Sequence, residues 1–287
     1  MLQKCNIEGL NVRLSEGINY TKLLKLNYRN LILEALNMKE ILKLNNLYKD
    51  YGVKGFKTRV LNNISLTVKE GEFISIMGPS GAGKTTLLNL LSTLDKPTRG
   101  EILLDGVDIV KLKNKELSKV RKDNIGFIFQ DYSLLDNMKL MDNIALPLAL
   151  GRKRSKEIEE KVIKIADIFG LNDHLKKYPY ELSGGQKQRG AAARALITNP
   201  KVIFADEPTG ALDSRSSSDL LECLKKVNEE NKATIIMVTH DPFIASYSNK
   251  VYMLSDGEIK CQINKGNDRK EFYGKIIDLL ASLGGAK

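Results

Sequence analysis

The chain has 287 residues, of which 42% are apolar, and its formal net charge is +10. This length builds one large domain or two modest ones with a proper hydrophobic core. The three cysteines, Cys5, Cys223 and Cys261, lie far apart without metal-ligand spacing, which excludes a disulfide framework and favours a reducing, cytoplasmic setting. His174 and His240 are too few and too distant from each other for a zinc site.

The positive charge and the apolar runs limit the classes of partner. Lysines are interleaved with acidic residues, as in KLKNKELSKVRKD at 111–123, without an alternation of aromatic and basic residues. A solvated, lysine-rich surface is the simpler interpretation, and we expect no nucleic-acid partner. Apolar runs such as IALPLALG at 144–151 fall far short of the ~20 residues of a membrane-spanning helix, and the N-terminus has no signal-peptide core. Work at a membrane would need other chains to supply the spans.

Residues 1–37 differ from the rest of the chain. They contain scattered helical periodicity in NYTKLLKLNYRNLILEALN at 19–37, but no chemical motif. The segment is either an appended helix or an extension from an upstream start codon; we favour the second and expect it to be dispensable. A strand-like alternation, ILKLNNLYKDYG at 41–52, starts after Met38, so the folded domain is expected to begin there.

From residue 38 onward, the sequence predicts strands first, then a helical subdomain, and then alternating helices and strands. Short strands and turns are expected up to the glycine-rich stretch at 78–86, and hairpins are expected at Asp105–Gly106 and at Asp256–Gly257. Between them, about 131–182 is expected to form a helical subdomain, in which SKEIEEKVIKIADIF has one apolar face and stops at Gly170. After residue 182, helices and apolar strands alternate, which predicts parallel strands with crossover helices. Residues 266–287 are expected to form a helical tail.

A glycine-rich stretch, GPSGAGKTT at 78–86, lies between the apolar run EFISIM and the helical pattern LLNLLSTL. It satisfies G-x-x-x-x-G-K-[ST], in which glycines turn backbone N–H groups toward phosphate oxygens at a helix N-terminus. The Lys84 side chain can reach the β- and γ-phosphates, and the Thr85 hydroxyl can ligate magnesium. The loop predicts a nucleoside triphosphate site. The residues expected to contact the nucleotide are Gly78, Pro79, Ser80, Gly81, Ala82, Gly83, Lys84, Thr85 and Thr86.

An apolar strand that ends in two acids, KVIFADEP at 201–208, supplies the second part of a site. Asp206 at its carboxyl end can reach a magnesium ion, and Glu207 can polarise an attacking water. On its own, such a strand is equally consistent with two acidic residues that only cap the strand end and have no catalytic role. Its position downstream of the phosphate loop favours the catalytic interpretation.

The pentapeptide LSGGQ at 182–186 predicts a second anion-binding helix start. Ser183 and Gln186 fit the S-x-x-Q capping pattern, while Gly184 and Gly185 leave backbone N–H groups exposed. It could be no more than a well-capped helix, but it lies between the phosphate loop and the acidic pair.

Together these stretches resemble the ATP-binding-cassette (ABC) ATPases over about 38–265. In that family GPSGAGKTT is the Walker A loop, LSGGQ the signature and IFADE the Walker B strand. The resemblance implies an α/β P-loop fold with a mixed or parallel RecA-like core sheet, an antiparallel β-subdomain and an α-helical subdomain. It also gives roles to Asp213 of the D-loop, to Gln130 in FIFQD and to the switch histidine His240 in MVTHD. Tyr51 in KDYG matches the aromatic residue that stacks on adenine, with Tyr48 as the alternative.

The mechanism that the resemblance implies is a head-to-tail homodimer, in which two ATP molecules lie between the Walker A loop of one subunit and the signature of the other. Catalytic roles fall on Glu207, His240 and Gln130. The expected magnesium ligands are Thr85, Gln130 and Asp206. Gly190 departs from the larger residue expected inside the signature helix, where glycine costs up to ~1 kcal/mol relative to alanine, and the sequence offers no reason for it.

The arrangement of the motifs separates transport from other uses of such a cassette. Relatives that act on chromosomes split the cassette around a coiled coil, and those of translation carry two cassettes. This chain has one uninterrupted cassette with a helical insert of about 50 residues between Gln130 and Leu182. In transporters that insert receives a membrane permease, so we expect a permease at 131–150 and a location on the cytoplasmic face of the membrane. An ATPase acting on nucleic acid is the alternative from another class.

Three further phrases resemble the macrolide and lipoprotein branch of these transporters. They are FIFQDYSLLDNMKLMDNIALPL at 127–148, DEPTGALDS at 206–214 and RKEFYGKIIDLLASLGG at 269–285. They are closest to the bacitracin-type peptide-resistance exporters, which implies resistance to peptide antibiotics and a sensor kinase that acts through the permease. A lipoprotein-release or macrolide-type system is the alternative within the branch.

Overall fold

The structure, a computed structural model, describes residues 39–53, 56–151 and 153–284. Residues Glu40–Lys287 make up one compact unit. The expectation that residues 1–37 are dispensable concerns a segment outside the described residues. Within the described part of the chain, no helix is both long and apolar enough to cross a membrane.

The first part of the compact unit is an antiparallel sheet with strand order β2-β1-β4-β5. Its strands are β1 (Glu40–Val53), β2 (Phe56–Lys69), β4 (Arg99–Leu104) and β5 (Val107–Asp108). The expectation of short strands was wrong for β1 and β2, which have 14 residues each. Both continue past irregular pairing at Asn46 and Asn63, whose positive φ angles asparagine tolerates because its short polar side chain bonds locally.

The second sheet has six strands in the order β10-β9-β3-β8-β7-β6. They are β10 (Glu258–Asn264), β9 (Lys250–Ser255), β3 (Phe73–Met77), β8 (Ile235–Val238), β7 (Val202–Asp206) and β6 (Ile125–Ile128). All neighbours except β9 and β10 are parallel, as the alternation of helices and strands predicts. Because both faces are covered, β3 and β8 are buried along their whole length and read as continuous apolar runs.

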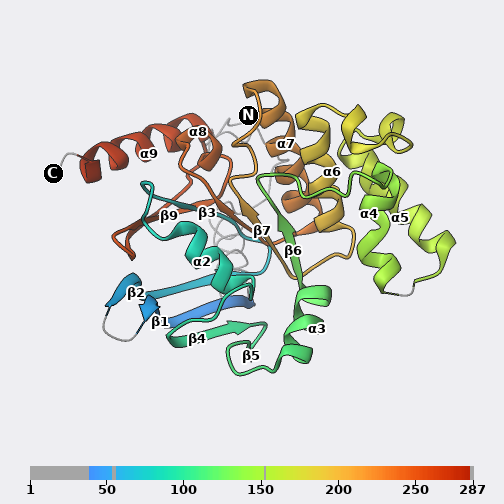
Figure 1. Ribbon diagram of the computed structural model, residues 1–287. Helices are drawn as coiled ribbons and strands as arrows, with labels where there is room; N and C mark the ends of the chain where they lie inside the picture. The colour runs from blue at the N-terminus through green and yellow to red at the C-terminus, as the bar shows by residue number, and fades with distance from the viewer. Residues whose placement is uncertain (1–38, 54–55, 152, 285–287) are drawn as a thin grey trace, which may run out of the picture. The chain divides into compact units, whose positions relative to one another are not determined.

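Helices cover the six-stranded sheet on both faces (Figure 1). The helices of the described residues are α2 (Lys84–Leu91), α3 (Asn114–Asn124), α4 (Leu140–Leu150), α5 (Ser155–Ile168), α6 (Gly184–Leu196), α7 (Ser214–Asn231), α8 (Pro242–Ala245) and α9 (Arg269–Gly284), with 3-10 turns at Asn172–His174 and Pro179–Glu181. Of these, α4 and α5 pack against α6 and not directly on the sheet. Successive residues of β3 point to opposite faces, so Phe73 belongs to the core under α4 to α7, whereas Ile74 and Ile76 belong to the core shared with α2 and the antiparallel sheet.

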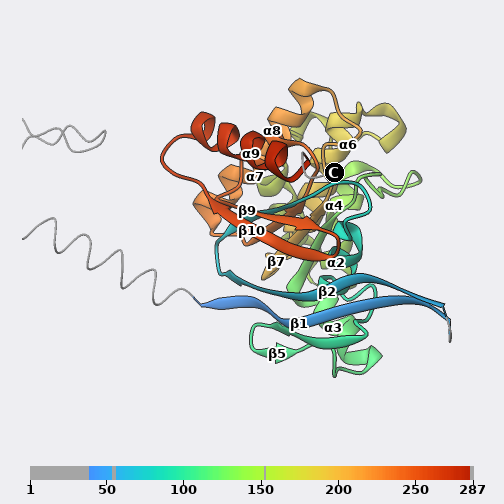
Figure 2. The same ribbon diagram turned by 90° about the vertical axis from the view of Figure 1, so that its left-hand side faces the viewer.

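Two tight hairpins confirm the turn predictions. Asp105 and Gly106 have φ angles of 51° and 78°, and Asp256 and Gly257 have 50° and 74°. Left-handed backbone at both central positions is typical of two-residue hairpins that match the twist of the strands. The Asp256–Gly257 turn also meets β2, where Asn62 donates a backbone hydrogen bond to the Gly257 carbonyl at 2.8 Å, and Figure 2 shows β9 and β10 above β2.

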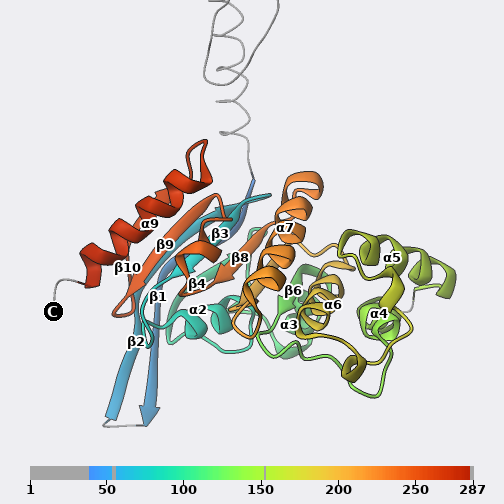
Figure 3. The ribbon, with the colours of Figure 1, turned by 90° about the horizontal axis from the view of Figure 1, so that it is seen from above.

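The helical pattern at 155–170 is confirmed by α5. Val162 and Ala166 are buried, Ile158 and Ile165 pack against the same core, and the helix stops before Gly170, whose φ is 61°. Seen from above, α4 and α5 lie on the side of the molecule opposite α9, which runs along β9 and β10 (Figure 3).

Candidate functional site

The phosphate loop joins the buried strand β3 to the N-terminus of α2, as its sequence predicts. Gly81 and Gly83 have φ angles of 78° and 99°, which residues with side chains rarely adopt. A Cβ atom at Gly78 would lie 2.0 Å from the carbonyl oxygen of Leu254, so the loop passes against β9 only because glycine stands there. The ammonium group of Lys84 is buried and donates to the carbonyls of Gly78 and Pro79, both at 2.9 Å.

Asp206, at the carboxyl end of β7, is half-buried, and its Oδ1 is a buried oxygen that has no hydrogen-bond partner among the described residues. Burial raises the pKa of Asp206 above its usual value, the neighbouring charge of Glu207 raises it further, and the charge of Lys84 lowers it. A buried acceptor without a donor is suited to a cation, so the Asp206 carboxylate fits a magnesium ligand.

The cavity beside Asp206 has a volume of about 480 Å³ and is lined by Phe129, Gln130, Asp131, Asp206 and Ala211. Two of the three expected magnesium ligands, Gln130 and Asp206, therefore line one cavity. Thr85 is exposed in the first turn of α2. The described residues hold no cluster of three or more His, Cys, Asp or Glu side chains that could bind a metal ion.

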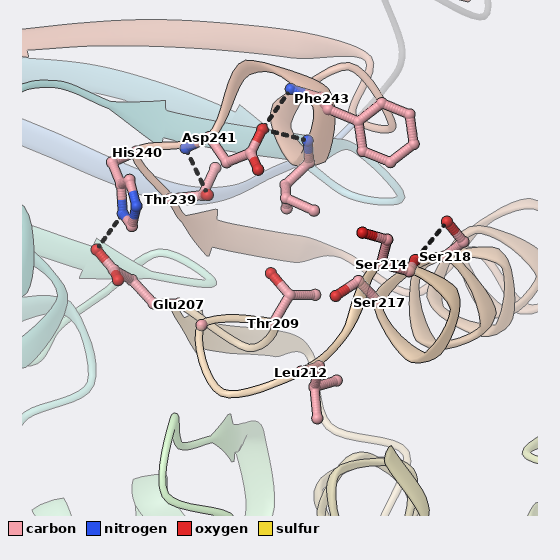
Figure 4. Close-up of a pocket in the computed structure, with 12 residues that line it drawn as sticks. Glu207, Thr209, Leu212, Ser214, Ser217, Ser218, Thr239, His240, Asp241 and Phe243 are labelled. Carbon is pink, nitrogen blue, oxygen red and sulfur yellow. Dashed lines mark hydrogen bonds and ion pairs between the residues drawn. The ribbon is translucent and has the colours of Figure 1, made fainter. Parts of the chain in front are cut away.

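Glu207 and His240 point toward each other (Figure 4), with Glu207 Oε1 3.1 Å from His240 Nδ1. The backbone of Glu207 is left-handed, with φ 42°, and its N–H donates to the carbonyl of Val238 at 3.0 Å. A non-glycine residue held in this conformation stores strain, which proteins concentrate at functional sites. Both side chains line a cavity of about 570 Å³ with Thr209, Gly210, Leu212, Ser214, Ser217, Ser218, Thr239, Asp241, Phe243 and Ile244.

Asp213, expected to contact nucleotide, caps α7 in this structure. Its carboxylate accepts hydrogen bonds from the N–H of Ser216 at 2.9 Å and from the Ser216 hydroxyl at 2.7 Å. These bonds hold the pKa of Asp213 below its usual value. The carboxylate is therefore partly engaged within its own subunit.

The signature forms the predicted capping box at the start of α6. Ser183 Oγ accepts from the N–H of Gln186 at 3.3 Å, and Gln186 Oε1 accepts from the N–H of Ser183 at 2.9 Å. The amide nitrogen of Gln186 lies 3.0 Å from Nε2 of His174, a residue that the sequence did not single out for the site. A Cβ at Gly185 would lie 2.7 Å from Ser216 Oγ, and one at Gly184 would lie 3.0 Å from the hydroxyl of Tyr132. The signature glycines thus allow close approach to neighbouring segments.

The two candidate tyrosines of β1 have different surroundings. The hydroxyl of Tyr51 donates to Asp95 Oδ2 at 2.7 Å, and part of its side chain is exposed. The ring of Tyr48 is flanked by Arg59 and Arg99, whose guanidinium carbons lie 5.4 and 4.7 Å from its centroid. Two cations lie against the ring of Tyr48, whereas one, Lys49, lies against the more exposed ring of Tyr51. Tyr51 therefore stays the first candidate for stacking on a base, and Tyr48 the alternative.

The hydrolytic candidates gather at one edge of the six-stranded sheet. The phosphate loop, Gln130, Glu207 and His240 follow β3, β6, β7 and β8, which are parallel, so their carboxyl ends lie together. The signature is not among them, because it starts α6 and follows none of these strands.

Comparison with known proteins agrees with this arrangement. A family model described as ABC transporter matches residues 61–210. The bacitracin export ATP-binding protein BceA of Halalkalibacterium halodurans is 50% identical over 248 residues, which cover 86% of this chain and 98% of the relative. The chain belongs to the ABC transporter family. Within that family it is an ATP-binding subunit. The chain is also 42% identical over 223 residues to the macrolide export ATP-binding/permease protein MacB of Syntrophobacter fumaroxidans, and the match covers 77% of this chain and 31% of MacB.

A solved structure extends the comparison to the fold and the reaction. The dimeric, post-hydrolysis state of the ATP-binding cassette MJ0796, bound to ADP and Pi, matches with a TM-score of 0.72 and 40% identity, covering 78% of this chain and 99% of that chain. MJ0796 is a protein of Methanocaldococcus jannaschii. The predicted α/β P-loop fold of the ABC ATPases is confirmed, and so is the assignment of this ABC transporter subunit as an ATPase.

Proposed function

We propose that this ATPase dimerises around two ATP molecules and drives a separate membrane permease that exports peptide antibiotics or confers resistance to them. The observation that carries the proposal is the division of the site. The phosphate loop, Gln130, Glu207 and His240 follow four strands of one sheet at the same edge, whereas the signature starts helix α6 and follows none of these strands. A second copy that brings its own signature to this edge completes the site. The dimeric MJ0796 relative supports such an assembly.

In this proposal Glu207 is the general base. It accepts the proton of the attacking water, while His240 holds the carboxylate in position from 3.1 Å and can bond the γ-phosphate. Lys84 leaves the two loop carbonyls that it now bonds and turns to the β- and γ-phosphates. The backbone N–H groups of 78–86 surround the phosphates. Magnesium, when bound, neutralises charge that develops on the phosphates.

Asp206, Gln130 and Thr85 are the residues that would hold magnesium. The unpartnered buried oxygen of Asp206 supports the first, and the shared cavity supports the second. A Cβ atom at Gly210 would come within 2.8 Å of the Gln130 amide nitrogen. The close fit between Gln130 and the segment that follows Glu207 lets a change at the phosphates reach residues after 130.

A groove beside those residues is suited to a permease. It has a volume of about 550 Å³ and lies between α3, β6, α4 and α6. Its walls combine apolar and basic side chains: Phe127, Phe129, Leu146, Pro147 and Leu150, with Arg121, Lys122 and Arg194. An amphipathic helix of the permease with an apolar face and a carboxylate suits these walls.

The groove narrows the expected contact region 131–150. Leu134 and Met141 pack against the core, so they offer little to a partner. Leu135 and Leu150 are exposed, and Leu150, which lines the groove, is 69% exposed. We propose that the end of α4 contacts the permease, which would hold this subunit at the cytoplasmic face of the membrane. A sensor kinase acting through the permease remains part of the proposal.

The 50% identity to a bacitracin export protein supports peptide antibiotics as the substrate class, and the similarity to MacB keeps macrolide or lipoprotein export as the second candidate.

Both substrate classes are tested in a strain that lacks this gene and carries either the wild-type copy or Glu207→Gln. We expect lower resistance to bacitracin-type peptides in the deletion and in the Glu207→Gln strain, with macrolide resistance unchanged. Unaltered peptide resistance in the deletion strain would refute the peptide assignment. ATPase activity stimulated by nucleic acid, and not by a permease, would refute transport.

A further inference from the structure

The Tyr51 side chain is held on two sides by charged residues. Its hydroxyl donates to Asp95 Oδ2 at 2.7 Å, and the ammonium group of Lys49 lies 4.6 Å from the centroid of its ring. Lys49 and Asp95 also contact each other, at 2.8 Å. Because one face of the ring is covered by Lys49 while 42% of the Tyr51 side chain is exposed, the accessible face is the one away from Lys49.

Lys49 is the buried member of this cluster, with 8% of its surface accessible. Besides Asp95 and the Tyr51 ring, its ammonium group bonds the carbonyl of Lys96 at 2.7 Å. A buried charge is tolerated only when it is paired and hydrogen-bonded, and this one is. Burial acts to raise the pKa of Asp95, but hydrogen bonds from Lys49 and Tyr51 outweigh it and leave that pKa below its usual value.

The cluster is attached to the helix that carries the phosphate loop. The N–H groups of Leu94 and Asp95 both donate to the carbonyl of Asn89, at 2.9 and 3.1 Å, which folds this segment back against α2. The tyrosine is therefore fixed to the same helix whose N-terminus faces the phosphates.

We propose that Lys49 and Asp95 are positioning residues that hold Tyr51 as a preoriented stacking surface for the nucleobase, so that this ATPase distinguishes nucleotides by their base. The proposal rests on the role of Tyr51 in the proposed function. If the Tyr51 ring is fixed at one distance from the phosphate loop, it binds most tightly a base that reaches the ring and covers its face. A two-ring purine covers more of a tyrosine ring than a one-ring pyrimidine does. A freely rotating ring would discriminate less, because ordering it on binding costs entropy.

The experiment compares the binding of ATP, CTP and inorganic tripolyphosphate, all with magnesium, to the full chain. The ratio of ATP to tripolyphosphate affinity reports the base contribution, since both ligands share the phosphate loop. The variants are Tyr51→Phe, which removes the hydroxyl that Asp95 holds, and Asp95→Ala. The double variant Lys49→Met with Asp95→Ala avoids leaving a buried lysine unpaired. Tyr48→Phe is the matched control, because it removes the same group from the tyrosine whose ring lies between arginines.

We expect each test variant to lower the ratio of ATP to tripolyphosphate affinity by about 5-fold or more, within the range of a base-stacking contact. The preference for ATP over CTP should shrink in parallel, tripolyphosphate affinity should hold, and Tyr48→Phe should resemble the wild type. Equal losses for ATP and tripolyphosphate would show a merely structural role and overturn the proposal. The proposal would also be overturned if the wild type binds ATP more tightly than tripolyphosphate and the test variants keep the same ratio of the two affinities. A wild-type protein that binds tripolyphosphate as tightly as ATP would instead count against Tyr51 as the base site.

Discussion

Asp206 and Glu207 are consecutive carboxylates with different surroundings, and the difference separates their roles. Asp206 is half-buried at the end of β7, with a raised pKa and a buried oxygen that has no partner among the described residues. Glu207 lies in left-handed backbone and meets His240 at 3.1 Å. One residue is suited to a metal ion and the other to a proton, a division that depends on environment and not on residue type.

Glu207→Gln is predicted to keep ATP binding and to lower turnover by about 100-fold or more, because an amide cannot accept the proton of the attacking water. The variant should accumulate as an ATP-bound dimer, measurable by size-exclusion chromatography with ATP and magnesium. Wild-type turnover in the purified variant would contradict the assignment of Glu207 as the base.

Lys84→Ala gives the complementary prediction at the phosphate loop. Removing the buried ammonium group should weaken ATP binding itself, because no other charge of the loop faces the β- and γ-phosphates. Equilibrium titration with a fluorescent ATP analogue measures this, with Glu207→Gln as the control that keeps affinity. Equal affinity in Lys84→Ala and wild type would disprove our interpretation of the loop.

Asp206→Asn is predicted to raise the Tm of the nucleotide-free protein, where each 1 kcal/mol of recovered stability corresponds to about 2–4 °C in a domain of this size. The pKa of Asp206 is raised in the folded state, so above the unfolded value of 3.8 the native protein binds more protons than the unfolded one. The free energy of unfolding therefore falls as pH rises from 3.8 through the raised pKa of Asp206 in the folded protein. A neutral asparagine removes this loss. The gap between variant and wild type should close as pH falls toward 3.8. A lower Tm in the variant at neutral pH would contradict the argument.

At the scale of elements, the packing of α6 against α4 explains a residue that the sequence left without a reason. A Cβ atom at Gly190 would lie 2.5 Å from Leu140 Cδ1, and Leu140 is fully buried. The glycine therefore lets the N-terminus of α4 approach the signature helix, and the close packing compensates for the helix propensity lost at residue 190.

Gly190→Val is predicted to lower the free energy of unfolding by about 1–3 kcal/mol, because the added methyl groups overlap Leu140. Leu140→Ala opens that space, so the double variant should be more stable than the sum of the two single changes indicates. Urea denaturation of the four proteins gives the coupling energy. Strict additivity would mean that residues 190 and 140 do not compete for space.

The elements also show why some of the site follows from sequence and some does not. Gly78, Lys84 and Asp206 lie in short local patterns that combine turn chemistry with a buried strand, so the sequence predicts their position. The partners of Tyr51 and Gln186 do not form such a pattern. Asp95 lies 44 positions from Tyr51, and His174 lies 12 positions before Gln186 in a separate 3-10 turn. Contacts of this kind depend on tertiary packing, which spacing along the chain does not encode.

At the scale of the whole molecule, the signature and the hydrolytic groups of one chain serve different nucleotides in the proposed dimer. Ser183→Arg is predicted to leave ATP binding by the monomer nearly intact and to block the dimer, because a long cation replaces the small hydroxyl at the start of α6. Sedimentation in the Glu207→Gln background with ATP measures it. Loss of monomer binding to the same extent would show that the signature acts within its own subunit.

The groove at the end of α4 gives the last prediction. Leu150→Glu places a charge on the exposed apolar wall of the groove that Phe129 also lines, so it should weaken docking of the permease without touching the hydrolytic groups. ATPase activity of the isolated subunit should stay near wild type, while permease-stimulated activity and peptide resistance fall together. Ile163→Glu is the matched control, because Ile163 on α5 is similarly apolar and 48% exposed but does not line the groove. If both variants retain permease binding and stimulation in a pull-down and ATPase assay, the interface lies elsewhere. If both lose them equally, the effect is a general loss of surface apolarity and the groove is not the docking site.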